Sequence, residues 1–493
     1  NATDAINETL AGQVSRANTI MAYEFSSDSN DDMYKKYPNF SQALKDELQQ
    51  TIIAAASAED NETKYQIIEK FSQLFQDIYD TKMAYVKMIN EADQINASLY
   101  EIFEQGGVSQ EQLSEGTAAY DAIWDAYEAG SYSKEQALSM EALKETSIYQ
   151  KVHGAEPELV DGVYQIETPQ NLLWLANTVN AGNGSVKAIQ TAPLDMSEVL
   201  WHPMGNNSYL FTGSYDGQFY PITNIPAMFI GMADGATVTR VAIESGNIAS
   251  NTDIATHCGS IIGAVGTSLP CNISYCYSKA DMSGGTDVGG IAGKYYGNIN
   301  YCYFAGTIDG TSTVGGLIGS SHDGTYGFTA KNCFVYTNLL VGNVTYLGDL
   351  IGYCHEGSKF QDIWTTSTIG KVGGYMGGQQ ENINFVSEEE FFSGMVAYSL
   401  NELAPTTTWY QNLGEDLYPV LNPTHKTVII SAEGTIVNGD PGTAIENIDM
   451  TSSERTNVYD LQGRLIRTNV AVSNSLVNLP KGIYIVGGKK VQK

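Results

Sequence analysis

The hydrophobic positions of residues 1–155 follow the spacing of amphipathic helices. Glycine is scarce there, and apolar side chains recur every three or four residues. A helix with such a long apolar face must lie along partner helices to bury it. The clearest run keeps one face apolar for about ten helical turns, and its members are Ile67, Ile68, Phe71, Leu74, Phe75, Ile78, Tyr85, Ile89, Ala92, Ile95, Leu99 and Phe103.

Breaks in this pattern divide the N-terminal region into separate helices. Gly106, Gly107 and Gly130 are typical of helix ends, and Pro38 and Ser133 are typical of helix starts. The sequence therefore predicts an α-helical bundle over residues 1–155, with about four or five helices. Two roles stay open for it: a stalk or partner-docking surface, or a folded spacer.

From about residue 156 the helical period gives way to a repeated glycine block. The block is Gly, any residue, two mostly apolar residues and Gly, and it occupies residues 259–263, 289–293, 315–319, 348–352 and 373–377. Successive blocks start 30, 26, 33 and 25 residues apart, a period typical of a solenoid whose units must stack to bury their apolar faces. The sequence predicts a right-handed parallel β-helix with glycine at its corners, where φ can be positive.

Short strand-like pieces recur between the blocks with the same period. Residues 275–277 and 301–303 both read Tyr-Cys-Tyr, and a related piece contains Cys333. Because side chains alternate along a strand, the small thiol of each piece points into the bore and its tyrosines point outward. We expect Cys276, Cys302 and Cys333 to form an internal ladder of free, buried thiols.

The same alternation yields candidate ligand-binding residues. Tyr275 would stack on Tyr301 and Tyr277 on Tyr303, and such exposed rings would bind sugars or a partner protein through their apolar faces and hydroxyl tips. The alternative is that these four tyrosines only reinforce the sheet as cross-strand pairs, or lie under the helical domain.

Charge and cysteine content exclude several classes of function. The chain has 56 acidic and 26 basic side chains, a net charge of −30, which disfavours nucleic acid and bare anionic membrane as partners. No apolar stretch is long enough for a transmembrane helix, and a start at Asn1 suggests removal of a secretory signal. His257 beside Cys258 and His355 beside Cys354 lack the paired spacing of a zinc site, so no metal is expected.

The glycine blocks resemble the GLUG motifs of bacterial surface adhesins. The similarity extends upstream to residues 161–176, 201–205 and 211–217, where a short helix caps the first coil, and downstream to residues 391–401 and 409–421, which look like a closing segment. It covers residues 158–425. The blocks at 348–352 and 373–377 depart from the motif, so we expect irregular last coils. The resemblance implies a solenoid domain, 156–425, on a cell-surface protein.

The C-terminal residues 426–493 are predicted to form a small β-sandwich. Residues 457–464 and 479–490 alternate as two strand pieces with a turn between them. They are similar to the sorting modules that end type nine secretion substrates of Gram-negative gut and oral anaerobes. This similarity implies an exported, surface-associated protein.

Enzymatic function is not expected from the residue patterns. Pectin hydrolases, which share the β-helix scaffold, have paired aspartates, whereas this chain offers only fragments at Asn251-Thr-Asp253 with His257 and at His322-Asp323. A lyase would need a cationic base beside calcium-binding acids, and Arg240, the only arginine between residues 161 and 440, has no acidic cluster beside it. No nucleophile elbow and no phosphate-binding loop occurs, so no cofactor is expected. The favoured function is non-catalytic adhesion to a host or dietary glycan or glycoprotein; a carbohydrate-active enzyme and a structural surface component remain alternatives.

Overall fold

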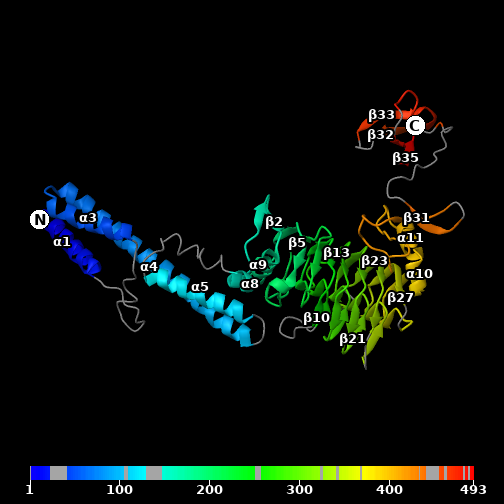
Figure 1. Ribbon diagram of the computed structural model, residues 1–493, viewed down its shortest axis with the longest axis horizontal. Helices are drawn as coiled ribbons and strands as arrows, with labels where there is room; N and C mark the ends of the chain where they lie inside the picture. The colour runs from blue at the N-terminus through cyan, green and yellow to red at the C-terminus, as the bar shows by residue number, and fades with distance from the viewer. Residues whose placement is uncertain are drawn as a thin grey trace. The chain divides into compact units, whose positions relative to one another are not determined.

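A computed structural model describes residues 2–22, 42–104, 109–128, 147–249, 257–322, 326–339, 344–366, 369–431, 434–439, 453, 455–459, 464–480, 483–486 and 489–492. Within these ranges the protein is mixed α and β, with helices near the N-terminus followed by parallel sheets (Figure 1). The chain forms two compact units, each described by itself. The first comprises Asn1–Glu158, Ile166–Thr178 and Met196–His202, and the second comprises the remainder. The predicted helix boundaries at Pro38, Gly106, Gly107, Gly130 and Ser133 lie outside the described residues.

The first unit is helical, as predicted. Its longest helix, α4, contains the whole apolar run that the sequence singled out. Leu10 of α1, Leu48 of α3 and Phe71 of α4 are buried in one shared core. The helices of residues 1–155 are α1 (Ala2–Met21), α3 (Gln42–Ser57), α4 (Asn61–Glu104), α5 (Gln110–Glu128) and α8 (Ser147–His153).

A short helix follows at the predicted place. α9 (Pro169–Asn180) begins after Thr168, whose hydroxyl accepts a hydrogen bond from the backbone N–H of Asn171 at 3.2 Å. This side chain satisfies one of the unpaired donors of the first helical turn. The 3-10 turn η1 (Met196–Glu198) lies further along the chain, after strands β3 and β4.

Parallel strands make up most of the second unit. They form one long sheet of fifteen strands, one of six and two of four. The long sheet contains β1 (Glu158–Val160), β2 (Val163–Ile166), β3 (Lys187–Gln190), β4 (Leu194–Asp195), β5 (Ser214–Asp216), β6 (Pro221–Thr223), β8 (Thr237–Thr239), β9 (Ala242–Ile243), β13 (Cys271–Ser274), β14 (Tyr277–Ser278), β18 (Gly297–Asn300), β19 (Tyr303–Phe304), β23 (Phe328–Val335), β27 (Lys359–Thr366) and β29 (Gln379–Val386).

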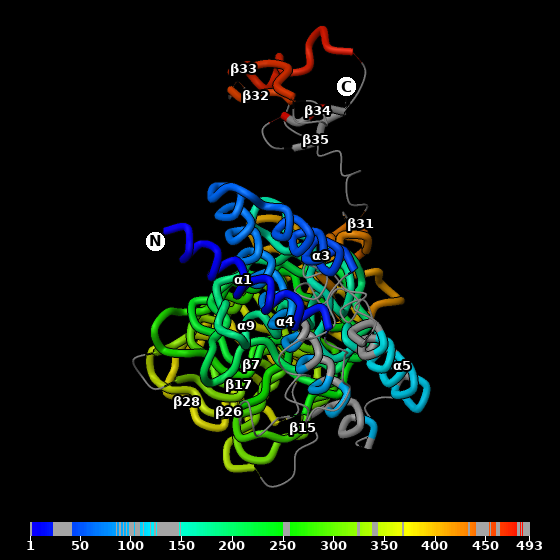
Figure 2. The backbone as a smooth tube through the Cα atoms, turned by 90° about the vertical axis from the view of Figure 1, so that its left-hand side faces the viewer, coloured from blue at the N-terminus to red at the C-terminus, as the bar shows by residue number. Residues whose placement is uncertain are grey.

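The other parallel sheets complete each coil of a β-helix-like stack. In Figure 2, β7, β17 and β26 of the six-stranded sheet lie close together on one side of the stack. That sheet contains β7 (Ile230–Ala233), β12 (Ile262–Val265), β17 (Ala292–Tyr295), β22 (Ile318–Ser321), β26 (Ile351–Cys354) and β28 (Gly373–Met376). The four-stranded sheets contain β10 (Asn247–Ala249), β15 (Asp281–Ser283), β20 (Thr307–Asp309) and β24 (Asn338–Leu339), and β11 (His257–Gly259), β16 (Asp287–Gly289), β21 (Thr313–Gly315) and β25 (Tyr346–Gly348).

The glycine blocks stack in register, which confirms the predicted repeat. Gly259 pairs with Gly289, Gly289 with Gly315, and Gly315 with Gly348 in successive parallel strands. The last block slips. Gly373 pairs with Ile351, the fourth residue of the preceding block, instead of with its first residue, Gly348. The expected irregularity of the last coils is therefore a register shift of three residues.

Glycine is needed in the blocks for a reason other than the predicted one. Among the described block glycines none has a positive φ, whereas Gly235, Gly284, Gly285 and Gly357, between other strands of the stack, do. The prediction of glycine at left-handed corners is therefore wrong for the blocks themselves. A Cβ on Gly289 would lie only 2.6 Å from the carbonyl carbon of Ile318, and one on Gly293 2.6 Å from the nitrogen of Cys258. The glycines therefore allow close approach of backbone segments. One row of left-handed corners, in successive coils, is occupied by other residues: Arg240, Tyr275, Tyr301, Asn332, Asp362 and Asn382.

The predicted thiol ladder is confirmed. Cys276, Cys302 and Cys333 are fully buried and free. The backbone N–H of Cys276 donates to Sγ of Cys302, 26 residues on, and that of Cys302 donates to Sγ of Cys333, 31 residues on, each at 3.4 Å. The thiols of Cys302 and Cys333 thus each accept a hydrogen bond from a backbone N–H of the preceding coil.

A closing segment follows the last coil. It contains α10 (Glu388–Phe392), α11 (Met395–Glu402) and the hairpin of β30 (Thr427–Ile430) and β31 (Ile436–Gly439). The side chain of Asn438 in the hairpin donates to the carbonyl of Gln411 at 2.6 Å. The segment's hydrogen bonds therefore extend past residue 425, the predicted domain boundary, to the hairpin.

The C-terminal residues form one antiparallel sheet in the order β33-β32-β34-β35. Its small core includes Val458, Val472 and Tyr484. A β-sandwich would need a second sheet, which the described residues do not contain. The elements are β32 (Arg455–Tyr459), β33 (Leu465–Ala471), η2 (Val472–Asn474), β34 (Ile483–Val486) and β35 (Lys489–Gln492).

Candidate functional site

The four predicted tyrosines stack in the predicted pairs. The rings of Tyr275 and Tyr301 lie 4.9 Å apart with 8° between their planes, and those of Tyr277 and Tyr303 lie 4.7 Å apart at 6°. Phe334 continues the second stack, 4.7 Å from Tyr303. Parallel in-register pairing places these rings directly above one another.

The expectation that these tyrosines form an open face is wrong for one pair. Tyr277 is 9% exposed and Tyr303 is 1% exposed, whereas Tyr275 and Tyr301 are half-buried. The cover is the closing segment of the same unit, a role that the sequence alternative gave to the helical domain. We call Tyr277, Tyr303, Phe334 and Trp364, which lie in register on successive strands, the covered row.

Trp409 fixes the closing segment on the covered row. Its ring lies 5.3 Å from Phe334 and 6.1 Å from Tyr303, and its indole N–H donates to Oδ1 of Asn332 at 2.6 Å. The amide of Asn332 in turn donates to the carbonyl of Leu400 at 2.8 Å. Asn332, at a left-handed corner, thus contacts both α11 and the tryptophan.

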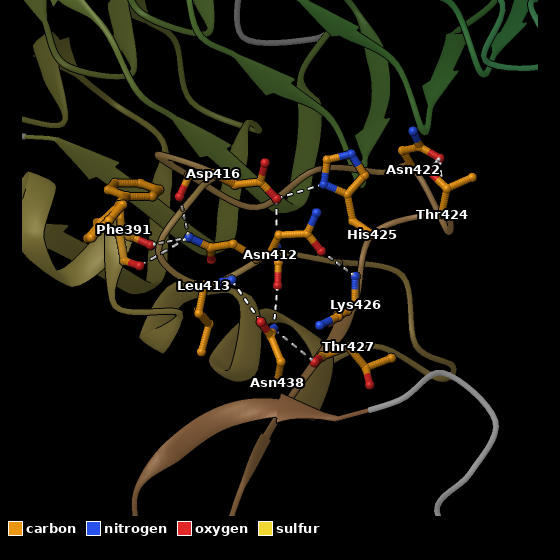
Figure 3. A network of polar contacts seen from close by, with 12 residues as sticks. Phe391, Asn412, Leu413, Asp416, Asn422, Thr424, His425, Lys426, Thr427 and Asn438 are labelled. Atoms are coloured by element: carbon orange, nitrogen blue, oxygen red, sulfur yellow. Dashed lines mark hydrogen bonds and ion pairs between the residues drawn. The ribbon is translucent and has the colours of Figure 1, made fainter.

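The loop after Trp409 is held by a polar network (Figure 3). Oδ2 of Asp416 accepts from the backbone N–H of Asn412 at 2.6 Å and lies 2.7 Å from Nδ1 of His425. Oδ1 of Asn438 accepts from the N–H of Leu413 at 2.9 Å. The second ring nitrogen of His425 points away from Asp416 in Figure 3, so the carboxylate fixes the orientation of the imidazole.

Between this loop and the covered row lies a cleft with a volume of about 250 Å³. On the β-helix side, Oε1 of Glu244 accepts from the hydroxyl of Tyr277 at 2.5 Å and Oε2 lies 2.7 Å from the ammonium of Lys279. The cleft therefore combines aromatic rings with charged side chains. Its lining residues are Glu244, Tyr277, Lys279, Tyr303, Glu415, Asp416, Leu417, Tyr418, Val420, Leu421, Asn422 and His425.

The phenols of the cleft stay protonated at neutral pH. Burial raises the pKa of Tyr418 to about 12. Burial, together with the Glu244 carboxylate, raises the pKa of Tyr277 well above its ordinary value. Both hydroxyls are therefore neutral groups that donate hydrogen bonds.

Chemistry by thiols or by a bound metal finds no support in the described residues. No group of three or more His, Cys, Asp or Glu side chains among them could hold a metal ion. Burial raises the pKa of Cys258 to about 12 and that of Cys271 to about 11, which keeps both thiols in the unreactive protonated form. Nδ1 of His257 lies 2.6 Å from Oδ2 of Asp287.

The residues that partly match enzyme motifs either contact neighbouring groups of the fold or lie outside the described ranges. Asn251, Asp253 and Asp323 are outside them. His322 contacts the carbonyl of Val265 through Nε2 at 2.8 Å. Arg240 pairs with a single carboxylate, its Nε donating to Oδ1 of Asp216 at 2.9 Å.

Sequence reasoning found two of the residues that line the cleft, Tyr277 and Tyr303, but missed the polar ones. Asp416 and His425 are nine residues apart in a loop without regular secondary structure, and no spacing rule points to them. Tyr418 fell within the segment recognised only as a closing element. Glu244 and Lys279 occupy adjacent coils, so a search for charged pairs one coil apart would have found them.

Fold and cleft together define a β-helix-like protein with a partly aromatic, partly charged cleft under its closing segment. No family model and no curated protein matches the sequence. A solved structure that is similar is that of a putative immunoglobulin A1 protease from Bacteroides ovatus, with 18% identity and a TM-score of 0.38, covering 55% of this chain and 95% of that one. A likeness at that level carries no argument about function. No described helix combines the length and apolar composition needed to cross a bilayer.

Proposed function

We propose that the protein is an exported cell-surface binding protein that holds a neutral glycan in the cleft, without performing chemistry on it. The observation that carries this proposal is the composition of the cleft. Tyrosine rings from the covered row and from the closing loop line the same space as Glu244, Lys279 and His425. An aromatic wall with a few fixed polar groups suits a ligand that has apolar faces and hydroxyl edges.

The charge of the cleft favours a neutral sugar over an acidic one. Glu244, Glu415 and Asp416 contribute three carboxylates, and Lys279, which pairs with Glu244, contributes one ammonium group. A sialic or uronic acid would bring a further negative charge into this field and into a chain of net charge −30. We therefore expect hexoses or N-acetylated hexosamines to be preferred.

The bonding of the carboxylates supports binding rather than hydrolysis. Glu244 accepts from Tyr277 through one oxygen and pairs with Lys279 through the other. Asp416 is engaged by His425 and by the backbone of Asn412. A glycosidase needs one carboxyl group that delivers a proton and a second that acts as base or nucleophile. Here the carboxylates of Glu244 and Asp416, two of the three in the cleft, instead hold neighbouring groups in place.

The finer architecture belongs to the same proposal. The in-register glycine blocks support a right-handed GLUG-type β-helix, and the shared core of α1, α3 and α4 supports an N-terminal helical bundle. The antiparallel C-terminal sheet supports a module similar to type nine sorting domains. A surface location follows from these two resemblances.

The experiment is calorimetric titration of the full chain with neutral oligosaccharides selected on a glycan array. We expect saturable binding that His425→Ala weakens at least ten-fold, because the fixed imidazole is lost from the cleft wall. Tyr209→Ala is the control, since Tyr209 is 47% exposed and does not line the cleft, and it should bind within two-fold of the parent. Release of reducing ends from the ligand, or unchanged binding by His425→Ala, would overturn the proposal.

A further inference from the structure

A second group of aromatic side chains lies on the last coils, outside the cleft. Tyr353 of β26 and Tyr375 of β28 are register partners, and their rings stack at 4.6 Å with 16° between the planes. Tyr346 meets the ring of Tyr353 edge-on at 4.8 Å, and His355 lies 4.8 Å from the same ring. We call these four residues the open platform.

The open platform faces solvent, unlike the covered row. Tyr375 is 47% exposed, and the other three side chains are half-buried. Tyr353 occupies the centre, since its ring contacts all three others. The backbone N–H of His355 donates to the hydroxyl of Ser321 at 2.8 Å, which ties the platform to the preceding coil.

The register shift of the last block creates this arrangement. In the regular coils, Ala264, Lys294, Ser320 and Tyr353 occupy corresponding positions in successive strands. Without the shift, Tyr375 would correspond to Leu350, which is fully buried. The shift of three residues instead brings Tyr375 beside Tyr353.

From this geometry we infer that the open platform is a second saccharide-binding site, which takes a neutral polysaccharide chain by stacking a sugar ring on the face of Tyr375 that Tyr353 does not cover. The C–H groups on one face of a pyranose carry a partial positive charge that matches the negative face of an aromatic ring. Phenol and imidazole groups at the edge of the rings offer hydrogen bonds to sugar hydroxyls. The four side chains include no carboxylate and no ammonium group.

The size of the platform favours a saccharide over a protein partner. A stable protein–protein interface buries about 800 Å² on each partner. Tyr375 is 47% exposed and the other three side chains are half-buried, so together they expose far less than that area. One or two sugar rings fit a patch of this size.

Further rings lie on the preceding coils in a position to extend the site. His322 follows β22 as His355 follows β26, so the two histidines correspond in successive coils. Tyr326 lies 6.3 Å from His322 and 5.4 Å from Tyr296, both edge-on. This continuation along the stack is the reason for proposing a chain rather than a single sugar.

The inference goes beyond the cleft and does not depend on it. It is tested by affinity electrophoresis of the full chain in gels containing an α-glucan, a β-glucan, an α-mannan or a galactan, with polygalacturonate as the anionic comparison. We expect at least one neutral polysaccharide to retard the protein and polygalacturonate not to. Tyr375→Ala should weaken that retardation at least ten-fold, Tyr375→Phe should keep it within three-fold, and Tyr209→Ala should leave it unchanged.

The variants separate the two sites. His425→Ala, in the cleft, should retain the retardation that Tyr375→Ala loses. No retardation by any of the four neutral polysaccharides would overturn the inference, as would equal retardation of Tyr375→Ala and the parent chain. Self-association in sedimentation that Tyr375→Ala abolishes would also overturn it, because the platform would then be a protein interface.

Discussion

Two tyrosine stacks on the same solenoid have nearly the same geometry and opposite surroundings. Tyr277 and Tyr303 lie 4.7 Å apart, and Tyr353 and Tyr375 lie 4.6 Å apart. Tyr303 is 1% exposed, whereas Tyr375 is 47% exposed. Strand register alone produces the stacking in both places. Whether a stack becomes part of the core or part of the surface depends on a segment from elsewhere in the chain.

This difference in exposure separates aromatic residues that stabilise the fold from aromatic residues that are available to bind a ligand. In the covered row, aromatic rings add apolar area to a core that includes Trp409 and Phe391, so their main contribution is to hold the closing segment in place. On the open platform the same kind of ring gains little from burial and remains available to a ligand. Each prediction below tests one side of this comparison.

The largest effect is expected from Trp409→Ala. The indole is fully buried against Phe334 and Tyr303 and is hydrogen-bonded to Asn332, so its removal should lower the free energy of unfolding by about 3–5 kcal/mol. Hydrogen exchange of peptides from residues 387–431 should accelerate accordingly. Tyr375→Ala is the control from the exposed stack. A loss below about 1 kcal/mol would mean that the tryptophan does not anchor the segment.

Asn332→Ala should have the next largest effect. It leaves the indole N–H of Trp409 and the carbonyl of Leu400 without their side-chain partner in a dry environment, at a cost of about 1–3 kcal/mol. Asn382 is a matched control, because it occupies the equivalent left-handed corner two coils later and is exposed. Asn382→Ala removes a hydrogen bond to Oδ1 of Asp362 at 2.9 Å and should cost less than Asn332→Ala. Equal losses in the two variants, measured by urea unfolding, would contradict the role given to the covered position.

The sequence alone indicated the repeat, but it did not indicate that the closing segment covers Tyr277 and Tyr303. The glycine blocks recur at a nearly constant period, so stacking of Gly259, Gly289 and Gly315 and of the Tyr-Cys-Tyr pieces followed from spacing. The cover includes the contact between Asn332 and Trp409, which are 77 residues apart. No periodicity links those two residues, because the closing segment is not part of the repeat.

The open platform was hidden for a different reason. Aligning the glycine blocks places Tyr375 at an inward position, beside Leu350, and only the register shift turns it outward. The shift accompanies a buried carboxylate, Asp349, which accepts from the backbone N–H groups of Ile369, Gly370 and Lys371 at 2.7 to 3.1 Å. The aspartate replaces the second glycine of its block, so the departure from the motif was visible while its consequence was not.

The third prediction concerns the bore that lies behind both stacks. Burial raises the pKa of Cys271 to about 11, against about 8.5 in an unfolded chain. Between these values the unfolded state loses the thiol proton and the folded state keeps it, so stability falls as the pH rises. Relative to Cys271→Ala, the parent chain should lose about 2 kcal/mol of unfolding free energy between pH 8 and pH 10. The difference is measured by urea unfolding at the two pH values, and a pH-independent difference would show that water reaches the bore.

The smallest effect is expected where the comparison is most direct, at Tyr375. Removal of its ring deletes one cross-strand aromatic contact with Tyr353 at the surface, so Tyr375→Ala should lower the unfolding free energy by about 0.5–1 kcal/mol. Tyr375→Phe keeps the ring and should change it by less than about 0.5 kcal/mol. A loss as large as that of Trp409→Ala would mean that this tyrosine is a core residue like Tyr303. A small loss, together with the loss of polysaccharide retardation in the same variant, is the combination that distinguishes a recognition surface from a structural one.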